Sequence, residues 1–157
     1  MTLEAALESA YMTLLRAEEP TLAAVRVNRA AAGLAQTGVS SDTGAIPFEF
    51  LPLPCITLTA ARGAEDPPAS GVFEVTLTIE AEATDQPTGA DLTADTLFST
   101  AIRPLLYVRL HVLLSAAYPA LICYGMPRRM DGMSQTAGDA TFIRTATATF
   151  VCALSQN

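Results

Sequence analysis

The sequence contains no lysine and a single histidine, His111, among its 157 residues. All nine basic residues are arginine, against sixteen acidic residues, so the formal net charge is −7. Proteins that hold nucleic acid by its phosphates need a basic surface, so this balance argues against that class. One histidine also gives little support to a zinc site. The acidic charge suits a protein that stays soluble while it assembles, or one that must not adhere to DNA.

The sequence signatures of common nucleotide-binding and hydrolytic enzymes are missing. There is no Walker loop, no GxGxxG, no GxSxG and no HExxH. His111 lies in the apolar stretch "YVRLHVLLS", and no nucleophile or carboxylate stands at a spacing from it that would indicate a catalytic site. A structural histidine is therefore the simpler interpretation, and a catalytic base is the alternative. We expect no enzymatic activity and no cofactor.

Long hydrophobic runs are also missing. The longest stretch without a charged residue, Leu110 to Pro127, is interrupted by His111, Pro119 and Gly125. A membrane helix needs about 20 predominantly apolar residues, so a core helix followed by a core strand is expected and no membrane partner. Glu4 and Glu8 stand where a secretory signal would be basic, which predicts synthesis in the cytosol.

Cysteine is scarce, and its placement favours buried thiols. The three cysteines are Cys55, Cys123 and Cys152, and no CxxC pair occurs. Each lies in an apolar, strand-like setting, where a free buried thiol is the usual state.

Apolar periodicity defines the first half of the chain. It predicts a helix from Thr2 to Arg16 with Thr2 as N-cap, followed by "TLAAVRVNRAAAGLAQ", which fits a helix or a strand. Residues 33–54 are predicted to form a long polar and extended loop. Two strands, Cys55–Ala61 and Gly71–Ala83, are predicted to pair as an antiparallel hairpin around the loop "RGAEDPPASG".

The second half is predicted to contain a helix and two strands. Asp91 caps a helix over residues 92–117, which Pro104 kinks or divides in two. The predicted core residues of this helix are Leu97, Ile102, Leu105, Leu106, Leu110, Val112 and Leu113. A short strand follows in "ALICYGM", then a loop or hairpin connection at residues 127–139, then a last strand at residues 140–154. The order α-β-β-α-β-β predicts one α+β domain over residues 1–157, with helices packed on one face of an antiparallel or mixed sheet.

Three glutamates make the strand at Gly71–Ala83 unusual. Glu74, Glu80 and Glu82 alternate with apolar residues, and no basic residue lies among them. They are either the solvated face of a surface strand or an acidic functional face. Glu80 and Glu82 share one strand face, but the DxDxDG spacing of a calcium loop is absent, so we expect no metal site.

A second candidate surface is the segment after the short strand. Arg128 and Arg129 stand beside three methionines in "GMPRRMDGM", namely Met126, Met130 and Met133. Methionine and arginine are enriched at protein interfaces, which favours a subunit or partner contact. A phosphate or acidic partner is a further possibility, and a solvent-exposed turn is the alternative.

The element order resembles a known family of structural proteins. The helix, "LPLPCITLTA", "FEVTLTIEAEA", a second helix, "LICYGM" and "FIRTATATFVCAL" look like the tail-terminator, or tail-completion, proteins of long-tailed bacteriophages. The resemblance spans about Leu3 to Leu154. The chain departs from the family pattern in its alanine-rich N-terminal region and in Pro104.

The resemblance implies a structural virion protein that forms a hexameric ring, caps the tail tube and joins it to the neck. The implied partners are further copies of the chain, the tail tube protein and head-completion or connector proteins. In such a ring, made in the host cytoplasm and located in the virion, Glu74, Glu80 and Glu82 would line a channel. DNA would pass through this channel without specific binding, because like charges repel.

Two alternatives remain. One is another neck, connector or tail subunit of the same machine. The other is a small-molecule-binding domain or enzyme that uses His111 and the Arg128–Arg129 loop. Oligomeric state distinguishes the second from a ring protein.

Overall fold

A computed structural model describes residues 2–18, 26–29, 55–84, 102–137 and 141–156. The elements in chain order are α1 (Leu3–Glu18), β1 (Arg26–Arg29), β2 (Cys55–Glu65), β3 (Phe73–Thr84), the 3-10 helix η3 (Arg103–Leu106), α3 (Leu110–Ala117), β4 (Leu121–Cys123), β5 (Arg129–Ala137) and β6 (Thr141–Leu154). The predicted loop at residues 33–54 and the predicted cap at Asp91 lie outside the described residues.

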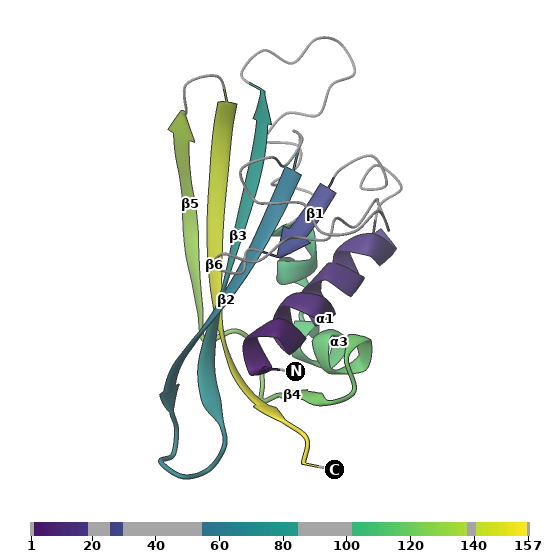
Figure 1. The fold of residues 1–157 in the computed structure, drawn as a ribbon, viewed down its shortest axis with the longest axis vertical. Helices are drawn as coiled ribbons and strands as arrows, with labels where there is room; N and C mark the ends of the chain where they lie inside the picture. Colours follow the sequence, from purple (N-terminus) through teal and green to yellow (C-terminus); the bar gives the residue numbers. More distant parts are fainter. Residues whose placement is uncertain (1, 19–25, 30–54, 85–101, 138–140, 157) are drawn as a thin grey trace.

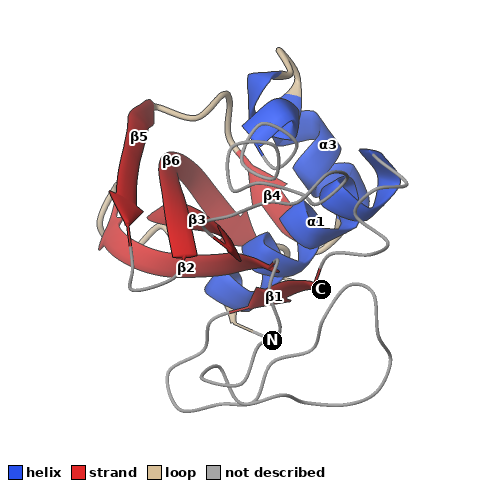
Figure 2. Cartoon of the chain, turned by 90° about the horizontal axis from the view of Figure 1, so that it is seen from above, coloured by secondary structure: helices blue, strands red, loops and turns tan. Residues whose placement is uncertain are grey.

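The described strands form one six-stranded sheet in the order β1-β2-β3-β6-β4, and β5 pairs with β6 as well. The β1–β2 pair is parallel and the other described pairs are antiparallel, so the sheet is mixed. Helices α1 and α3 lie together on one side of the strands (Figures 1 and 2). This confirms the predicted α+β class, the β2–β3 hairpin and the packing of the helices on one face.

The core fills the space between the helices and the central strands. Large residues of β3 stand beside small or aromatic residues of β6. The pairs in register are Val75 with Phe150, Leu77 with Ala148, and Ile79 with Ala146, and all six side chains are buried. Small alanines next to branched residues leave room for a helix to approach the sheet closely, which favours dense packing.

Helix α1 contributes a stripe of buried residues. Leu3, Leu7, Tyr11 and Leu15 recur every four positions and are buried, as helical periodicity requires for one face. The Thr2 hydroxyl accepts a hydrogen bond from the Ala5 N–H at 3.2 Å, which confirms the predicted N-cap.

Glu8 is a buried carboxylate inside this helix. It is 6% exposed, and its Oε1 accepts a hydrogen bond from the Ala60 N–H of β2 at 2.8 Å. Strand β1 pairs with β2 only as far as Leu58. Glu8 therefore accepts the hydrogen bond of the Ala60 N–H beyond the point where the pairing of β2 with β1 ends.

In its described part, the helix predicted over residues 92–117 is divided, which is one of the two alternatives predicted at Pro104. The chain forms η3 at Arg103–Leu106 and starts α3 separately at Leu110. Pro104 stands in the first turn of η3, where its missing N–H costs nothing, and the helical phase changes at Arg109. Two predicted core residues are exposed: Leu106, the last residue of η3, by 67%, and Val112, which follows the phase change, by 41%.

Parts of two segments that were predicted as loops are strands. Strand β2 continues through Arg62 to Glu65, and residues Arg129–Ala137, within the predicted connection at 127–139, form β5. Their sequences are polar and show no alternation of apolar residues, so periodicity does not predict these strands. They form because pairing with β3 and β6 supplies their backbone hydrogen bonds. A register shift between Asp131 and Ser134 absorbs the irregular part of β5 as a bulge.

Candidate functional site

The face of the sheet that points away from the helices is made mainly of threonine. Thr59, Thr78 and Thr147 stand side by side across β2, β3 and β6. The rows on either side are Thr57, Glu80 and Thr145, and Ala61, Thr76 and Thr149. We call the seven threonines of these rows, with Glu74 and Glu80, the threonine face. Its alternation with the buried core residues follows from the two-residue period of a strand.

The threonine face offers hydroxyl groups rather than charged groups at its centre. The Oγ1 atoms of Thr76 and Thr149 are 3.0 Å apart and form a cross-strand hydrogen bond. Thr57 is buried, whereas the other six threonines are partly or fully exposed. β-branched residues favour the extended backbone, and their hydroxyls can hold water. The surface is suited to contact with water.

At one end of this face, the two surfaces predicted from the sequence meet. Arg128 Nη1 lies 3.0 Å from Glu74 Oε1 and 3.8 Å from Asp66 Oδ2. Glu74 thus has a basic partner, which comes from a distant segment and not from its own strand. All three side chains are 40–58% exposed, so solvent screens the pairs and each contributes little to stability.

The turn between β4 and β5 positions Arg128. The Tyr124 N–H donates to the Val151 carbonyl and the Arg128 N–H to the Thr149 carbonyl, each at 2.8 Å. Strands β4 and β5 are thus two parts of one interrupted edge strand along β6. Gly125 has a φ of +83°, a conformation that glycine adopts without strain, and it turns the chain out of β4.

The other predicted surface residues lie along β3, the turn and β5. Glu80 is partly buried in the threonine face, between Thr57 and Thr145. Glu82 stands opposite Cys55 and Ile143 in the strand register. Met126 is 42% exposed in the turn.

Residues Arg129, Met130 and Met133 belong to strand β5 rather than to the predicted loop. The register places Arg129 opposite Thr149 and Met130 opposite Ala148. Their side chains, like that of Glu82, lie outside the described part of the structure.

His111 and Arg128 do not share a site. His111 is partly buried on α3, and its Nδ1 is buried with no hydrogen-bond partner among the described residues. Arg128 binds Glu74 on the opposite face of the sheet from the helices. The sheet therefore separates the two groups that the enzyme alternative would combine.

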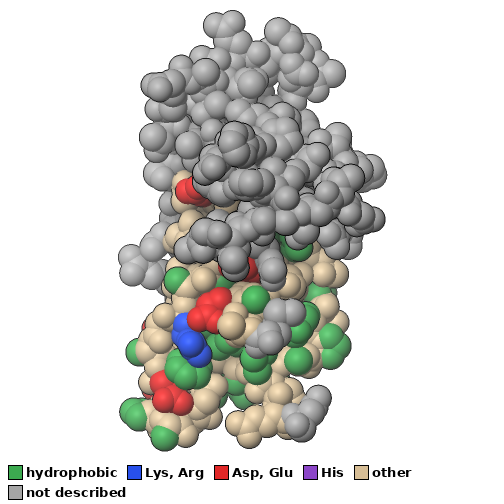
Figure 3. All heavy atoms as spheres, viewed as in Figure 1, with side chains coloured by type: hydrophobic (Ala, Val, Ile, Leu, Met, Phe, Trp, Pro, Cys, Tyr) green, Lys and Arg blue, Asp and Glu red, His purple; other side chains and the backbone are tan. Residues whose placement is uncertain are grey.

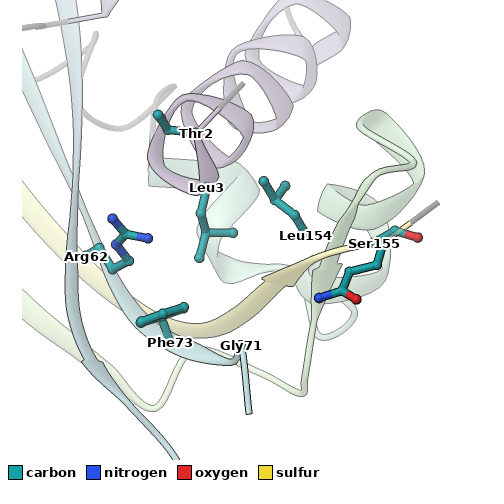
Figure 4. Close-up of a pocket in the computed structure, with 8 residues that line it drawn as sticks. Thr2, Leu3, Arg62, Gly71, Phe73, Leu154 and Ser155 are labelled. Carbon is teal, nitrogen blue, oxygen red and sulfur yellow. The ribbon is translucent and has the colours of Figure 1, made fainter. Parts of the chain in front are cut away.

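A shallow pocket of about 340 Å³ lies between the start of α1, the β2–β3 pair and the end of β6. Arg62 stands at one side, with its Nε 3.3 Å from Glu4 Oε1 and its guanidinium 4.9 Å from the centre of the Phe73 ring. Leu3, Phe73 and Leu154 point into the opening between the elements (Figure 4). Sequence reasoning missed this pocket, because the three segments meet only in the folded chain.

On the face that Figure 3 shows, charge is sparse and mixed in sign. Figure 3 shows a small basic patch bordered by acidic atoms, amid apolar and uncharged surface. Within the described residues, no three histidine, cysteine, aspartate or glutamate side chains are grouped to hold a metal ion. Among the described helices, none is both long enough and apolar enough to cross a membrane.

No protein-family model matches the sequence, and a search of curated proteins finds no match.

The ion pairs of Arg128 give a first test of the site. We expect Arg128→Ala to lower the free energy of unfolding by less than about 1 kcal/mol, because the pairs are exposed. The loss should shrink further in high salt, and urea denaturation at two ionic strengths measures both effects.

Arg109→Ala is the matched control, since Arg109 is exposed and has no ion pair among the described residues. A loss above about 2 kcal/mol for Arg128→Ala, unchanged by salt, would show that the guanidinium has a packing role instead.

Proposed function

We propose that this chain is a structural subunit of a long-tailed bacteriophage, namely a tail terminator. It assembles into a ring, and we expect that ring to be a hexamer. The ring caps the tail tube and joins it to the neck of the virion. Its partners are further copies of the chain, the tail tube protein and head-completion or connector proteins. The chain is not an enzyme in this proposal and needs no cofactor.

The observation that carries the proposal is the two-sided character of the sheet. One face is buried under α1 and α3, and the other presents rows of threonine across β2, β3 and β6. A face of small polar side chains can border a water-filled channel without closing it. The helix layer, on the other side of the sheet, then faces away from the channel and makes the contacts with neighbouring subunits.

Electrostatics supports passage of DNA without binding. DNA carries one negative charge per ~1.7 Å of its axis, so an acidic or neutral wall does not hold it. Glu80 lies within the threonine face, and Glu82 follows it two residues on along β3. The pairing of Glu74 with Arg128 leaves Glu80 and Glu82 as the stronger candidates for a repelling wall.

The helix layer exposes apolar side chains that a neighbouring subunit would cover. Val108 is 80% exposed and Leu106 is 67% exposed, and both lie at the turn between η3 and α3. Adjacent exposed apolar residues of this size are typical of contact surfaces. Arg103, in η3, is exposed as well and adds a residue type that interfaces favour.

The test is assembly in solution and on tail tubes. Light scattering over a concentration series gives the mass of the particle, and negative-stain images of samples with added tail tubes show whether caps form. Rings, or caps on tube ends, are the expected result. The double variant Leu106→Ser with Val108→Ser should lose both, because exposed apolar contacts drive association.

Ala116→Ser, an exposed change on α3, is the control and should assemble like the unchanged chain. A chain that stays monomeric at every concentration and ignores tail tubes would overturn the proposed function. Intact assembly of the double variant would overturn the assigned contact alone.

A further inference from the structure

Cys123 of β4 and Cys152 of β6 lie directly opposite each other in the strand register. Their Sγ atoms are 3.5 Å apart, and both side chains are buried in the core cluster. Free buried cysteines usually serve as small packing residues. Two thiols in contact can also be oxidised together, with the loss of two electrons, to form one disulfide.

The hydrogen-bond pattern shows that the two cysteines form a non-hydrogen-bonded pair, the type of antiparallel pair with the shorter Cα–Cα distance. The next pair, Tyr124–Val151, is hydrogen-bonded, since Tyr124 N–H donates to Val151 O, and so is Ala120–Ser155, three positions from the cysteines, where Ser155 N–H donates to Ala120 O. Pairs alternate along an antiparallel ladder, so Cys123 and Cys152 form a non-hydrogen-bonded pair. Its Cα atoms are expected at about 4.5 Å, within the range of about 4.4–6.8 Å that a disulfide spans.

We propose that Cys123 and Cys152 are a modification site, at which a small disulfide of the glutathione class converts the two thiols into one intramolecular disulfide. The Cys123 thiolate attacks one sulfur of the oxidant, forms a mixed disulfide and releases one glutathione thiol. The Cys152 sulfur, on losing its proton to solvent, then attacks Cys123 and releases the second. Two protein thiols are oxidised and one glutathione disulfide is reduced to two thiols.

The surroundings of the two sulfurs assign these roles. The hydrogen bond from Cys152 lowers the pKa of the Cys123 thiol, and the nearby Ser115 hydroxyl also lowers it. The contact with Cys123 raises the pKa of Cys152, and burial raises it further. Cys123 is therefore the better nucleophile, since the thiolate is the reactive form. Cys123 is also the more accessible, at 8% exposure against 0% for Cys152.

Access comes from the shortness of β4. The strand has three residues and stands at the end of the sheet order, with β6 as its partner in the described sheet. Short edge elements open at a much smaller free-energy cost than the whole fold. Opening β4 exposes Cys123 while β3 and β6 stay paired. This inference concerns the chain alone and does not depend on the proposed function.

The test uses the full chain, reduced, desalted and incubated with oxidised and reduced glutathione at graded ratios. The remaining thiols are alkylated and the protein is digested with trypsin. Cleavage after arginine puts Cys55, Cys123 and Cys152 in separate peptides, residues 30–62, 110–128 and 145–157. We expect one linked species, peptide 110–128 joined to 145–157, an intact mass lower by about 2 Da before alkylation, and Cys55 fully alkylated.

Variants make the assignment specific. Cys123→Ser and Cys152→Ser should each abolish the link, and Cys55→Ser should keep it at the unchanged level. The oxidised chain should also melt at a temperature higher by roughly 5 °C or more, because the bond closes a loop that contains all of β5. Oxidation in urea is the unfolded reference, in which all three pairings should appear.

Exclusive formation of glutathione adducts on single cysteines, a link through Cys55, or no reaction in the folded chain would each overturn the proposal. The last outcome would show that the two thiols serve only in packing. If a serine variant fails to fold, the peptide map of Cys55→Ser still decides the question.

Discussion

Replacing Phe150 by alanine should cost about 3–5 kcal/mol of unfolding free energy, the largest single effect we expect in this protein. Phe150 is fully buried in the middle of β6 and stands opposite Val75 of β3, under the helix layer. Removing the ring loses its transfer free energy and leaves a cavity. The surrounding strands cannot close that cavity, because both are held in long ladders.

Urea denaturation with a fluorescence or circular-dichroism signal measures the loss. Phe150→Leu is the matched control, since it keeps most of the volume and should cost clearly less, about 1–2 kcal/mol. A cost for Phe150→Ala within about 1 kcal/mol of the unchanged chain would show that the site collapses around the missing ring, contrary to the packing described here.

The second large effect is expected at Glu8, where leucine should lower the unfolding free energy by about 1–3 kcal/mol despite its better helix propensity and greater hydrophobicity. The carboxylate accepts the Ala60 N–H at 2.8 Å from inside the protein. Leucine leaves this backbone donor without its acceptor at the edge of β2. The free energy lost by leaving a buried N–H without an acceptor exceeds the free energy gained by burying the apolar leucine side chain.

Glu8→Gln separates the hydrogen bond from the charge. The amide oxygen can accept the same N–H, so this variant should lose less than half of what Glu8→Leu loses. Hydrogen exchange at Ala60 gives an independent readout, because its amide should exchange faster in the leucine variant and stay protected in the glutamine variant. Equal stability of Glu8→Leu and the unchanged chain would mean that another group takes over the Ala60 donor.

Local patterns in the sequence were enough for the elements whose own residues carry a strong period. Helix α1 follows from apolar residues at helical spacing after Thr2, and β3 and β6 follow from strict alternation. Each of these elements buries one regular face, so the period survives in the sequence whatever the neighbours are. The α+β class and the packing of helices on one side follow from the order of these elements.

Strands β1 and β5 and the extension of β2 depend on their neighbours. The polar residues from Arg129 to Ala137 have no clear alternation, and β6 makes them a strand by offering an open row of backbone groups. Pro104 allowed both a kink and a new start, and packing chose the new start. Leu106 and Val112 were predicted in the core and are exposed, Leu106 at the end of η3 and Val112 after the break that rotates the turns of α3.

The candidate sites divide in the same way. By itself, the sequence determined that Glu74 and Glu80 share a strand face with threonines, which needs only the two-residue period of a strand. It also determined that the cysteines at 123 and 152 would be buried, because each lies in an apolar, strand-like segment. Tertiary structure alone decided that Arg128 lies against Glu74, that Glu8 caps the edge of β2, and that Cys123 faces Cys152. These contacts join residues 29 to 54 positions apart, and strand order and register, which no local pattern encodes, bring them together.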